Sequence, residues 1–162
     1  MSLDDFLKDS KEPAFVTETQ HDRAKAMNAH KRREEFKNQL RECNEIDAVM
    51  DGPKRNVYIV QTESGEALVW MHYSKAFNFW GGAVQKNDEL RARGSALNHA
   101  FLGANLDEYY LVPDKALHSG DFFMPVQNKN GSEHWRLAGK GDSGANRELL
   151  DANFTTLCEP FK

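Results

Sequence analysis

Histidine is the residue type in this sequence that is best suited to metal or acid–base chemistry. The six histidines are His21, His30, His72, His99, His118 and His134. Zinc sites are recognised by ligands at short regular spacings, such as HExxH or HxH, and none of the six falls into such a pattern. The two cysteines, Cys43 and Cys158, are far apart and supply no second half of a zinc site. Ligand spacing therefore predicts no metal site around the histidines.

A serine in a glycine-rich setting is a second candidate for chemistry. Residues 141–144, Gly-Asp-Ser-Gly, match the tetrapeptide around the nucleophile of chymotrypsin-like proteases, and His72 lies upstream as a nominal base. The sequence that surrounds the histidine in that fold is absent, so we interpret 141–144 as a glycine-rich loop. The sequence also lacks a phosphate loop ending in Lys-Ser or Lys-Thr and a Gly-x-Gly-x-x-Gly motif, which counts against an NTPase or a dinucleotide-dependent enzyme.

Basic residues are concentrated between residues 20 and 43. This segment has seven basic and four acidic residues, so it carries +3, whereas the rest of the sequence carries −7. Lys31, Arg32 and Arg33 are consecutive, so on a helix they spread over about 200° and cannot all face a core. At least one of them is expected to point outward beside Lys37. The cluster predicts a phosphate-binding face, and a solvated helix surface is the ordinary alternative.

Aromatic residues crowd the segment that follows. They are Tyr58, Trp70, Tyr73, Phe77, Phe79 and Trp80. Because side chains alternate along a strand, Trp70 and His72 share one face, whereas Val69, Met71 and Tyr73 share the other. If helices cover only one face, the other exposes aromatic rings beside Lys75, where bases could stack or a protein could dock. Trp80 joins the basic residues as a predicted nucleic-acid contact.

The spacing of apolar residues predicts the elements that position these side chains. A helix is expected at 19–44, and only its second half has a face wide enough to pack on a core. The runs at 56–62 and 67–74 are rich in β-branched and aromatic residues and flank a short link with a glycine, which predicts a hairpin. The further expected elements are a short helix at 2–8, strands at 46–50, 76–84 and 109–113, helices at 88–101, 114–118 and 146–153, and a second hairpin from 121–126 and 133–139.

This order predicts an α+β fold, in which a long amino-terminal helix leads into a mainly antiparallel, aromatic-rich sheet with one or two further helices. We expect an arm at 1–18 and a single domain at 19–162. Two widely spaced cysteines are expected to be reduced. No secretory signal or membrane span is recognisable, so the expected location is the cytoplasm, without a membrane partner.

A long helix, three strands, a helix and a further strand, together with the blocks FNFWGG and DEYYLVPDKAL, resemble the core of restriction-endonuclease-like domains of the PD-(D/E)xK type. The resemblance covers residues 33–117 and is architectural. It implies two acids that hold a divalent cation, usually Mg²⁺, and a lysine that steadies the attacking water or the scissile phosphate.

Carried onto this sequence, the resemblance implies Asp51 or Asp47 as the first acid and Glu66 or Glu63 as the second. These acids would be the metal ligands and catalytic residues, with Lys75 as the lysine. Glu35 on the preceding helix would be an accessory acid. The sequence departs from the family motif because no lysine stands two positions after either glutamate. The alternative interpretation is that these acids are turn residues.

Two functions follow. The first is a nuclease-like domain that binds nucleic acid through Lys31, Arg32, Arg33, Lys37 and Trp80, and that cleaves phosphodiesters if Mg²⁺ is held. The second is a non-catalytic interaction or regulatory module with a protein partner and no cofactor, such as a small accessory protein of a phage or bacterium. Net charge of −4 argues against a protein that coats nucleic acid by bulk attraction.

Overall fold

The computed structural model describes residues 18–76, 79–118, 123–137 and 157–162, with side chains from residue 28 onward except at positions 80 and 81. Three predictions lie outside these residues: the short helix at 2–8, the glycine-rich loop at 141–144 and the helix at 146–153. Within the described part of the chain, no helix is both long and apolar enough to cross a membrane.

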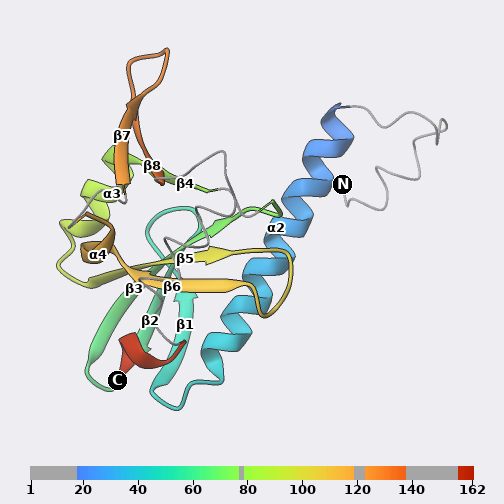
Figure 1. Ribbon diagram of the computed structural model, residues 1–162. Coiled ribbons are helices and arrows are strands. Elements are labelled where there is room, and N and C mark those ends of the chain that lie inside the picture. Colours follow the sequence, from blue (N-terminus) through green and yellow to red (C-terminus); the bar gives the residue numbers. More distant parts are fainter. Residues whose placement is uncertain (1–17, 77–78, 119–122, 138–156) are drawn as a thin grey trace.

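The fold is α+β, with one mixed five-stranded sheet and a smaller three-stranded sheet (Figure 1). In chain order the described elements are α2 (Glu18–Arg41), β1 (Ile46–Asp51), β2 (Val57–Thr62), β3 (Gly65–Tyr73), β4 (Trp80–Ala83), α3 (Val84–Arg91), β5 (Ala96–Leu102), β6 (Tyr109–Pro113), α4 (Asp114–His118), β7 (Phe123–Gln127), β8 (Glu133–Leu137) and the 3₁₀ turn η1 (Glu159–Phe161). The large sheet has the order β1-β2-β3-β5-β6, and the small one β4-β8-β7.

Both predicted hairpins are confirmed. β2 and β3 pair antiparallel from Val57 opposite Trp70 to Thr62 opposite Gly65. Gly65 has a φ of 137°, in the region that favours glycine, which explains why the tight link ends at this residue. β7 and β8 pair antiparallel as well. Local β propensity and turn residues are therefore sufficient to define these two hairpins.

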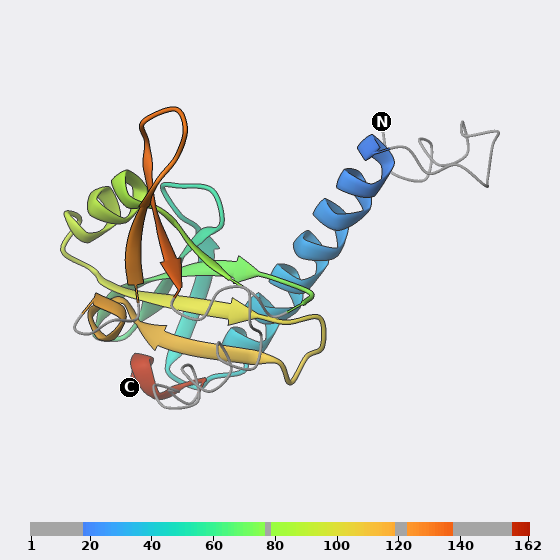
Figure 2. The same cartoon turned by 45° about the horizontal axis from the view of Figure 1, so that its top comes forward.

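Each face of the large sheet has its own core. On one face, Val69 and Met71 of β3 pack with Phe36 and Leu40, both fully buried in the second half of α2. On the opposite face, Trp70 packs against residues of α3 and β5. Figures 1 and 2 show α2 on one side of the sheet and α3 with the small sheet on the other. The predicted alternation along β3 is confirmed, and both faces are covered.

The segment 88–101, predicted as one helix, is wrong in its second half. The helix α3 spans Val84–Arg91, and the chain turns at Gly94, whose φ is 81°. Residues 96–102 then form β5, which pairs in parallel with β3. Nearly every residue of β5 is buried, and a strand covered on both faces reads as a continuous apolar run that periodicity does not distinguish from a helix. The sheet is therefore mixed.

The strand predicted at 76–84 is shorter than expected and belongs to the small sheet, not to the sheet of β2 and β3. Its described part is β4, which pairs with β8 in the small sheet and leads directly into α3. Together β4 and α3 form the crossover that a parallel pair such as β3 and β5 requires.

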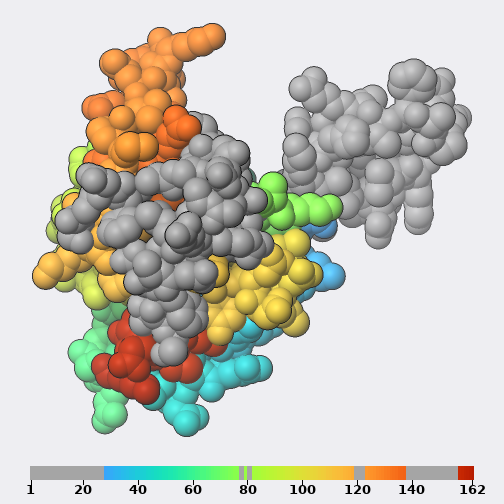
Figure 3. Space-filling model, viewed as in Figure 1, coloured from blue at the N-terminus to red at the C-terminus, as the bar shows by residue number. Residues whose placement is uncertain are grey.

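Cys43 and Cys158 are joined by a disulfide, so the expectation of two reduced thiols is wrong. The bond links residues 115 positions apart and lies beside Phe161, which is buried in the same core as Phe36. Figure 3 shows the carboxyl-terminal residues, in red, against the cyan surface of the amino-terminal elements. The spacing of the two cysteines in the sequence does not predict the disulfide, because only the folded chain brings them together.

Candidate functional site

Three side chains from β3, β5 and α4 form a hydrogen-bonded relay. His72 Nε2 lies 2.8 Å from His99 Nδ1, and His99 Nε2 lies 2.7 Å from Asp114 Oδ1. His99 is fully buried and Asp114 is 4% exposed, whereas His72 is only partly buried. The relay therefore runs from the protein interior to a position near the surface.

The carboxylate fixes the tautomer of both imidazoles. Because an ionised carboxylate only accepts hydrogen bonds, His99 must donate from Nε2 and accept at Nδ1. His72 must then donate from Nε2, which leaves a lone pair on its Nδ1. This Nδ1 makes no hydrogen bond with any described residue. The arrangement presents an unprotonated ring nitrogen at the outer end of the relay.

Further contacts hold the inner end in place. Asn87 Nδ2 donates to Asp114 Oδ1 at 3.0 Å, and His118 Nε2 lies 3.0 Å from the same oxygen. Arg91 Nε lies 3.3 Å from Oδ2. The helix expected from residue 88 begins earlier, at Val84, so that Asn87 lies inside α3 with its side chain buried against the relay. Asp114 thus has partners on both oxygens.

Burial and these contacts determine the protonation states. Burial lowers the pKa of His72 well below its ordinary value of 6.5, and the charges of His99 and Lys86 act in the same direction. Burial also lowers the pKa of His99, against the opposing effect of Asp114. For Asp114, burial alone would raise the pKa, but the hydrogen bond and charge of His99 and the bond from Asn87 lower it overall. At neutral pH His72 and His99 are therefore neutral and the carboxylate of Asp114 is charged.

The outer end of the relay opens into a cleft of about 620 Å³, which we call the histidine cleft. Its lining comes from α2, the loop before β2, strand β3, the segment around β4, and α3. The lining residues are Ala29, Arg33, Asn56, Trp70, Met71, His72, Tyr73, Ser74, Phe79, Gly82, Ala83 and Lys86. A cleft of this size is in the range of ligand sites.

The charge of the histidine cleft is positive. Arg33 and Lys86 line it, and none of its described lining residues is an acid. Arg33 Nε is buried without a hydrogen-bond partner. Lys86 Nζ lies 4.5 Å from the centre of the Trp70 ring, and burial together with the charges of Arg55 and Lys54 lowers its pKa. Two cations in a cleft whose described lining has no acid favour an anionic ligand.

Comparison with known proteins finds no match. No family model, curated protein or solved structure matches the chain. A functional assignment therefore rests on the chemistry of its own residues.

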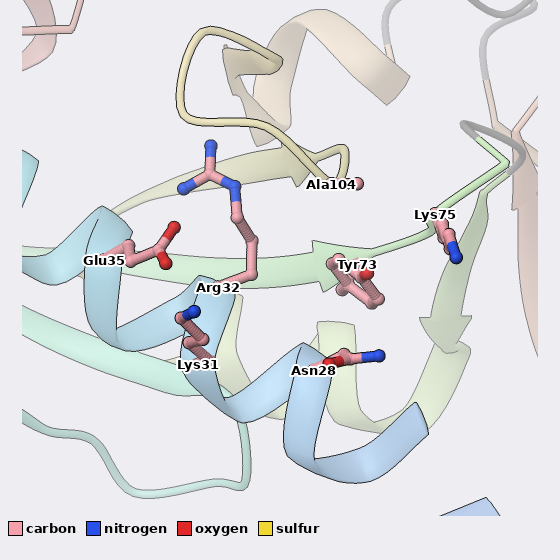
Figure 4. A pocket seen from close by; sticks show the side chains of 7 residues that line it. All are labelled: Asn28, Lys31, Arg32, Glu35, Tyr73, Lys75 and Ala104. Atoms are coloured by element: carbon pink, nitrogen blue, oxygen red, sulfur yellow. The ribbon is translucent and has the colours of Figure 1, made fainter. Parts of the chain in front are cut away.

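A second cavity of about 230 Å³ adjoins the histidine cleft at Tyr73, which lines both. We call it the Lys75 cavity. It contains four of the residues predicted from the sequence, brought together from α2 and the end of β3 (Figure 4). They are Lys31, Arg32, Glu35 and Lys75. Glu35 is the one acid of the described lining, so the two hollows together carry five cationic side chains and one acidic one.

The two predicted metal ligands do not meet. In the register of the sheet, Asp51 of β1 is level with Tyr58 and hence with Val69 of β3, three residues from Glu66 and two strands away. Glu66 lies at the start of β3 and Lys75 lies beyond its other end at Tyr73, and the seven residues from Glu66 to Tyr73 alone span about 23 Å at the rise of a strand. Ligands of one Mg²⁺ ion must lie within about 2.1 Å of it. Asp51 and Glu66 therefore cannot share an ion, and both are exposed.

Two of the five predicted nucleic-acid contacts are buried. Arg32 is 2% exposed and donates from Nε to the carbonyl of Gly103 at 3.0 Å, which fixes the loop between β5 and β6. Lys37 is 9% exposed, pairs with Glu34 at 2.6 Å and lies over the ring of Tyr58. These cations are engaged within the chain and cannot form the predicted outward face. Lys31 and Arg33 line the two hollows, and the side chain of Trp80 is outside the described residues.

The relay was missed from the sequence because its members are separated along the chain. His72, His99 and Asp114 meet only through the parallel pairing of β3 with β5, where Trp70 is opposite His99. The signal that was available is histidine inside β-rich apolar runs, at His72 and His99. A polar residue in such a run must find a partner when it is buried.

The relay predicts that acid weakens the fold. The pKa values of His72 and His99 are lower in the folded protein than in the unfolded chain, so the unfolded chain binds these protons more readily. The free energy of unfolding is therefore at its full value above pH 6.5 and falls as the pH drops below it. The free energy of unfolding should fall by up to about 1.4 kcal/mol per pH unit for each histidine. Urea unfolding between pH 7 and pH 5 measures this slope. It should be smaller in His72→Gln and unchanged in the control His30→Gln, an exposed histidine.

Proposed function

We propose that the protein binds single-stranded nucleic acid across the histidine cleft and the Lys75 cavity. The observation that carries the proposal is the excess of cations in these two adjoining hollows, together with the unpartnered Nε of Arg33. Phosphates would be neutralised by Arg33 and Lys86 in one hollow and by Lys31 and Lys75 in the other. Phosphate contacts of this kind supply most of the non-specific affinity for nucleic acid.

Tyr73 suits the junction of the two hollows. Its ring is partly buried and lines both, so a base held between two phosphates could stack on it. Base stacking on an aromatic side chain is worth about 1–3 kcal/mol per base and tolerates any sequence. One stacking ring between two groups of cations suits a single strand, whose bases are unpaired, better than a duplex.

The order of the elements gives no added support. The described order is α2, β1, β2, β3, β4, α3 and β5, so β5 lies where the resemblance to restriction-endonuclease-like domains assumed the end of a helix. The strands differ from those expected, and the separation of Asp51 from Glu66 speaks against the metal-dependent chemistry of those domains. The proposal is therefore one of binding, with no step through Mg²⁺.

The disulfide bears on where such binding would occur. Disulfides persist mainly in oxidising compartments. The pairing of Cys43 with Cys158 thus favours an oxidising environment over the cytoplasm that the sequence predicted.

Binding should depend steeply on salt, and the cleft cations should set the slope. For single strands, the slope of log K against log salt is about −0.7 for each phosphate neutralised. Arg33→Gln and Lys86→Gln should each make the slope shallower by about that amount, regardless of sequence. The measurement is fluorescence anisotropy of single strands of about 12 nucleotides at several salt concentrations.

The matched control is Arg93→Gln, which removes an exposed arginine that lines neither hollow. It should leave the salt slope unchanged. Absence of binding at low salt, or equal slopes in all variants, would contradict the proposal. Salt-insensitive capture of a protein partner would instead support the interaction module.

A further inference from the structure

Binding of a strand does not by itself require the His72–His99–Asp114 relay. A strand can be held by cations and a stacking ring, yet the lining of the histidine cleft also includes an imidazole whose outer nitrogen is unprotonated and unpaired among the described residues. Its other nitrogen is bonded to a second imidazole that ends on a buried carboxylate. This geometry suits proton removal from a bound ligand.

We propose that the histidine cleft cleaves single-stranded RNA, with His72 Nδ1 as the general base that removes the proton of a ribose 2′-hydroxyl. The inference rests on the proposed function, because the strand must first be held in the cleft. It identifies the substrate class as RNA rather than DNA, since only RNA carries this hydroxyl.

The choice of a 2′-hydroxyl follows from what the cleft offers. It contains one neutral base and two cations, Arg33 and Lys86, and its described lining has no acid that could hold a metal-bound water. A substrate that carries its own nucleophile next to the phosphate needs only deprotonation and charge stabilisation. Arg33 and Lys86 are placed to stabilise the negative charge that develops on the phosphate oxygens.

The step balances without an added reactant. His72 Nδ1 takes the 2′ proton, the 2′ oxygen forms a bond to phosphorus, and the bond from phosphorus to the 5′ oxygen breaks. The Lys86 ammonium gives a proton to the departing 5′ oxygen. Solvent then moves the proton from His72 to Lys86, which restores both side chains. The net proton transfer is from the 2′ oxygen to the 5′ oxygen. The products are a 2′,3′-cyclic phosphate and a 5′-hydroxyl.

Charged groups around His72 favour its role as a base at neutral pH. Arg33 from α2 and Lys86 from α3 line the same cleft, and His99 from β5 is hydrogen-bonded to His72, with Asp114 of α4 behind His99. Burial lowers the pKa of His72, so the basic form is already present at pH 7. When His72 takes a proton, its Nε2 proton can shift toward His99, and the charge is stabilised by Asp114.

The test uses the full chain and a labelled RNA of about 12 nucleotides in EDTA. We expect cleavage to a 2′,3′-cyclic phosphate, identified by mass. A matched strand with 2′-deoxyribose throughout should bind and remain intact. At protein concentrations that saturate the RNA, so that a change in affinity does not affect the rate, His72→Gln should lose at least about 100-fold in cleavage rate, the lower range for loss of a general base. His30→Gln is the control for the same substitution at an exposed site.

The outcomes separate the two proposals. Binding of RNA without cleavage overturns the inference and leaves the proposed function standing, whereas no binding of either strand overturns both. Cleavage that requires Mg²⁺, or that cuts the deoxyribose strand, overturns the inference as well. If His72→Gln does not fold, the deoxyribose strand and the identity of the product still decide the question.

Asp114 would act as a positioning residue through His99. In Asp114→Asn the imidazolium loses the charge that stabilises it, so the acid limb of the pH–rate profile should move to lower pH while the rate falls. A purely structural role would lower the amount of active protein without moving that limb.

Discussion

Asp114→Ala is expected to lower the free energy of unfolding by about 2–6 kcal/mol, because it leaves the buried donors of His99 and Asn87 without their acceptor. The carboxylate accepts from Asn87 at 3.0 Å, and it lies 2.7 Å from His99 Nε2 and 3.0 Å from His118 Nε2. His99 is fully buried, so its N–H cannot turn to water when the acceptor is removed. Each buried donor left without a partner costs about 1–3 kcal/mol.

Urea unfolding at pH 7 measures this loss, and Asp47→Ala is the matched control. Asp47 is exposed on β1, so its removal should change stability by no more than about 0.5 kcal/mol. A loss below about 1 kcal/mol for Asp114→Ala would show that the histidines find other partners and that the relay is not held by the carboxylate.

Trp70→Ala is expected to destabilise the protein by about 3–5 kcal/mol, because it empties a large volume in a packed core. Trp70 is 3% exposed, and its ring centre lies 5.0 Å from that of His72 and 5.2 Å from that of His99. A Cβ at Gly82 would come within 2.2 Å of the indole, so the chain there leaves room for no larger side chain. The indole therefore supports both the core and the wall of the histidine cleft.

Equilibrium unfolding of Trp70→Ala, beside Trp70→Phe and Met50→Ala, checks this expectation. Trp70→Phe keeps a ring and should cost less, whereas Met50 is 39% exposed and its truncation should cost little. A small effect of Trp70→Ala would mean that the space collapses without loss, and that the wall of the cleft is not rigid.

The relay illustrates how far the sequence leads toward a site. The alternation of side chains along a strand predicts that Trp70 and His72 share one face, and this is correct. The same reasoning treated 96–101 as helix, because Ala, Leu and His in a fully buried run carry no alternation. Without that strand nothing places His99 beside His72, and the resemblance implies Asp51, Glu66 and Lys75 instead, which the sheet keeps apart.

The sequence by itself determined the local features: the hairpin of β2 and β3, the hairpin of β7 and β8, and the core-facing second half of α2. These depend on turn residues and on periods of two or 3.6, which are set by neighbours along the chain. Only the tertiary structure decided the parallel pairing of β3 with β5, the burial of Arg32 and Lys37, the disulfide, and the meeting of His72, His99 and Asp114. These depend on contacts between distant segments, which form because apolar faces must be covered and buried polar groups must find partners.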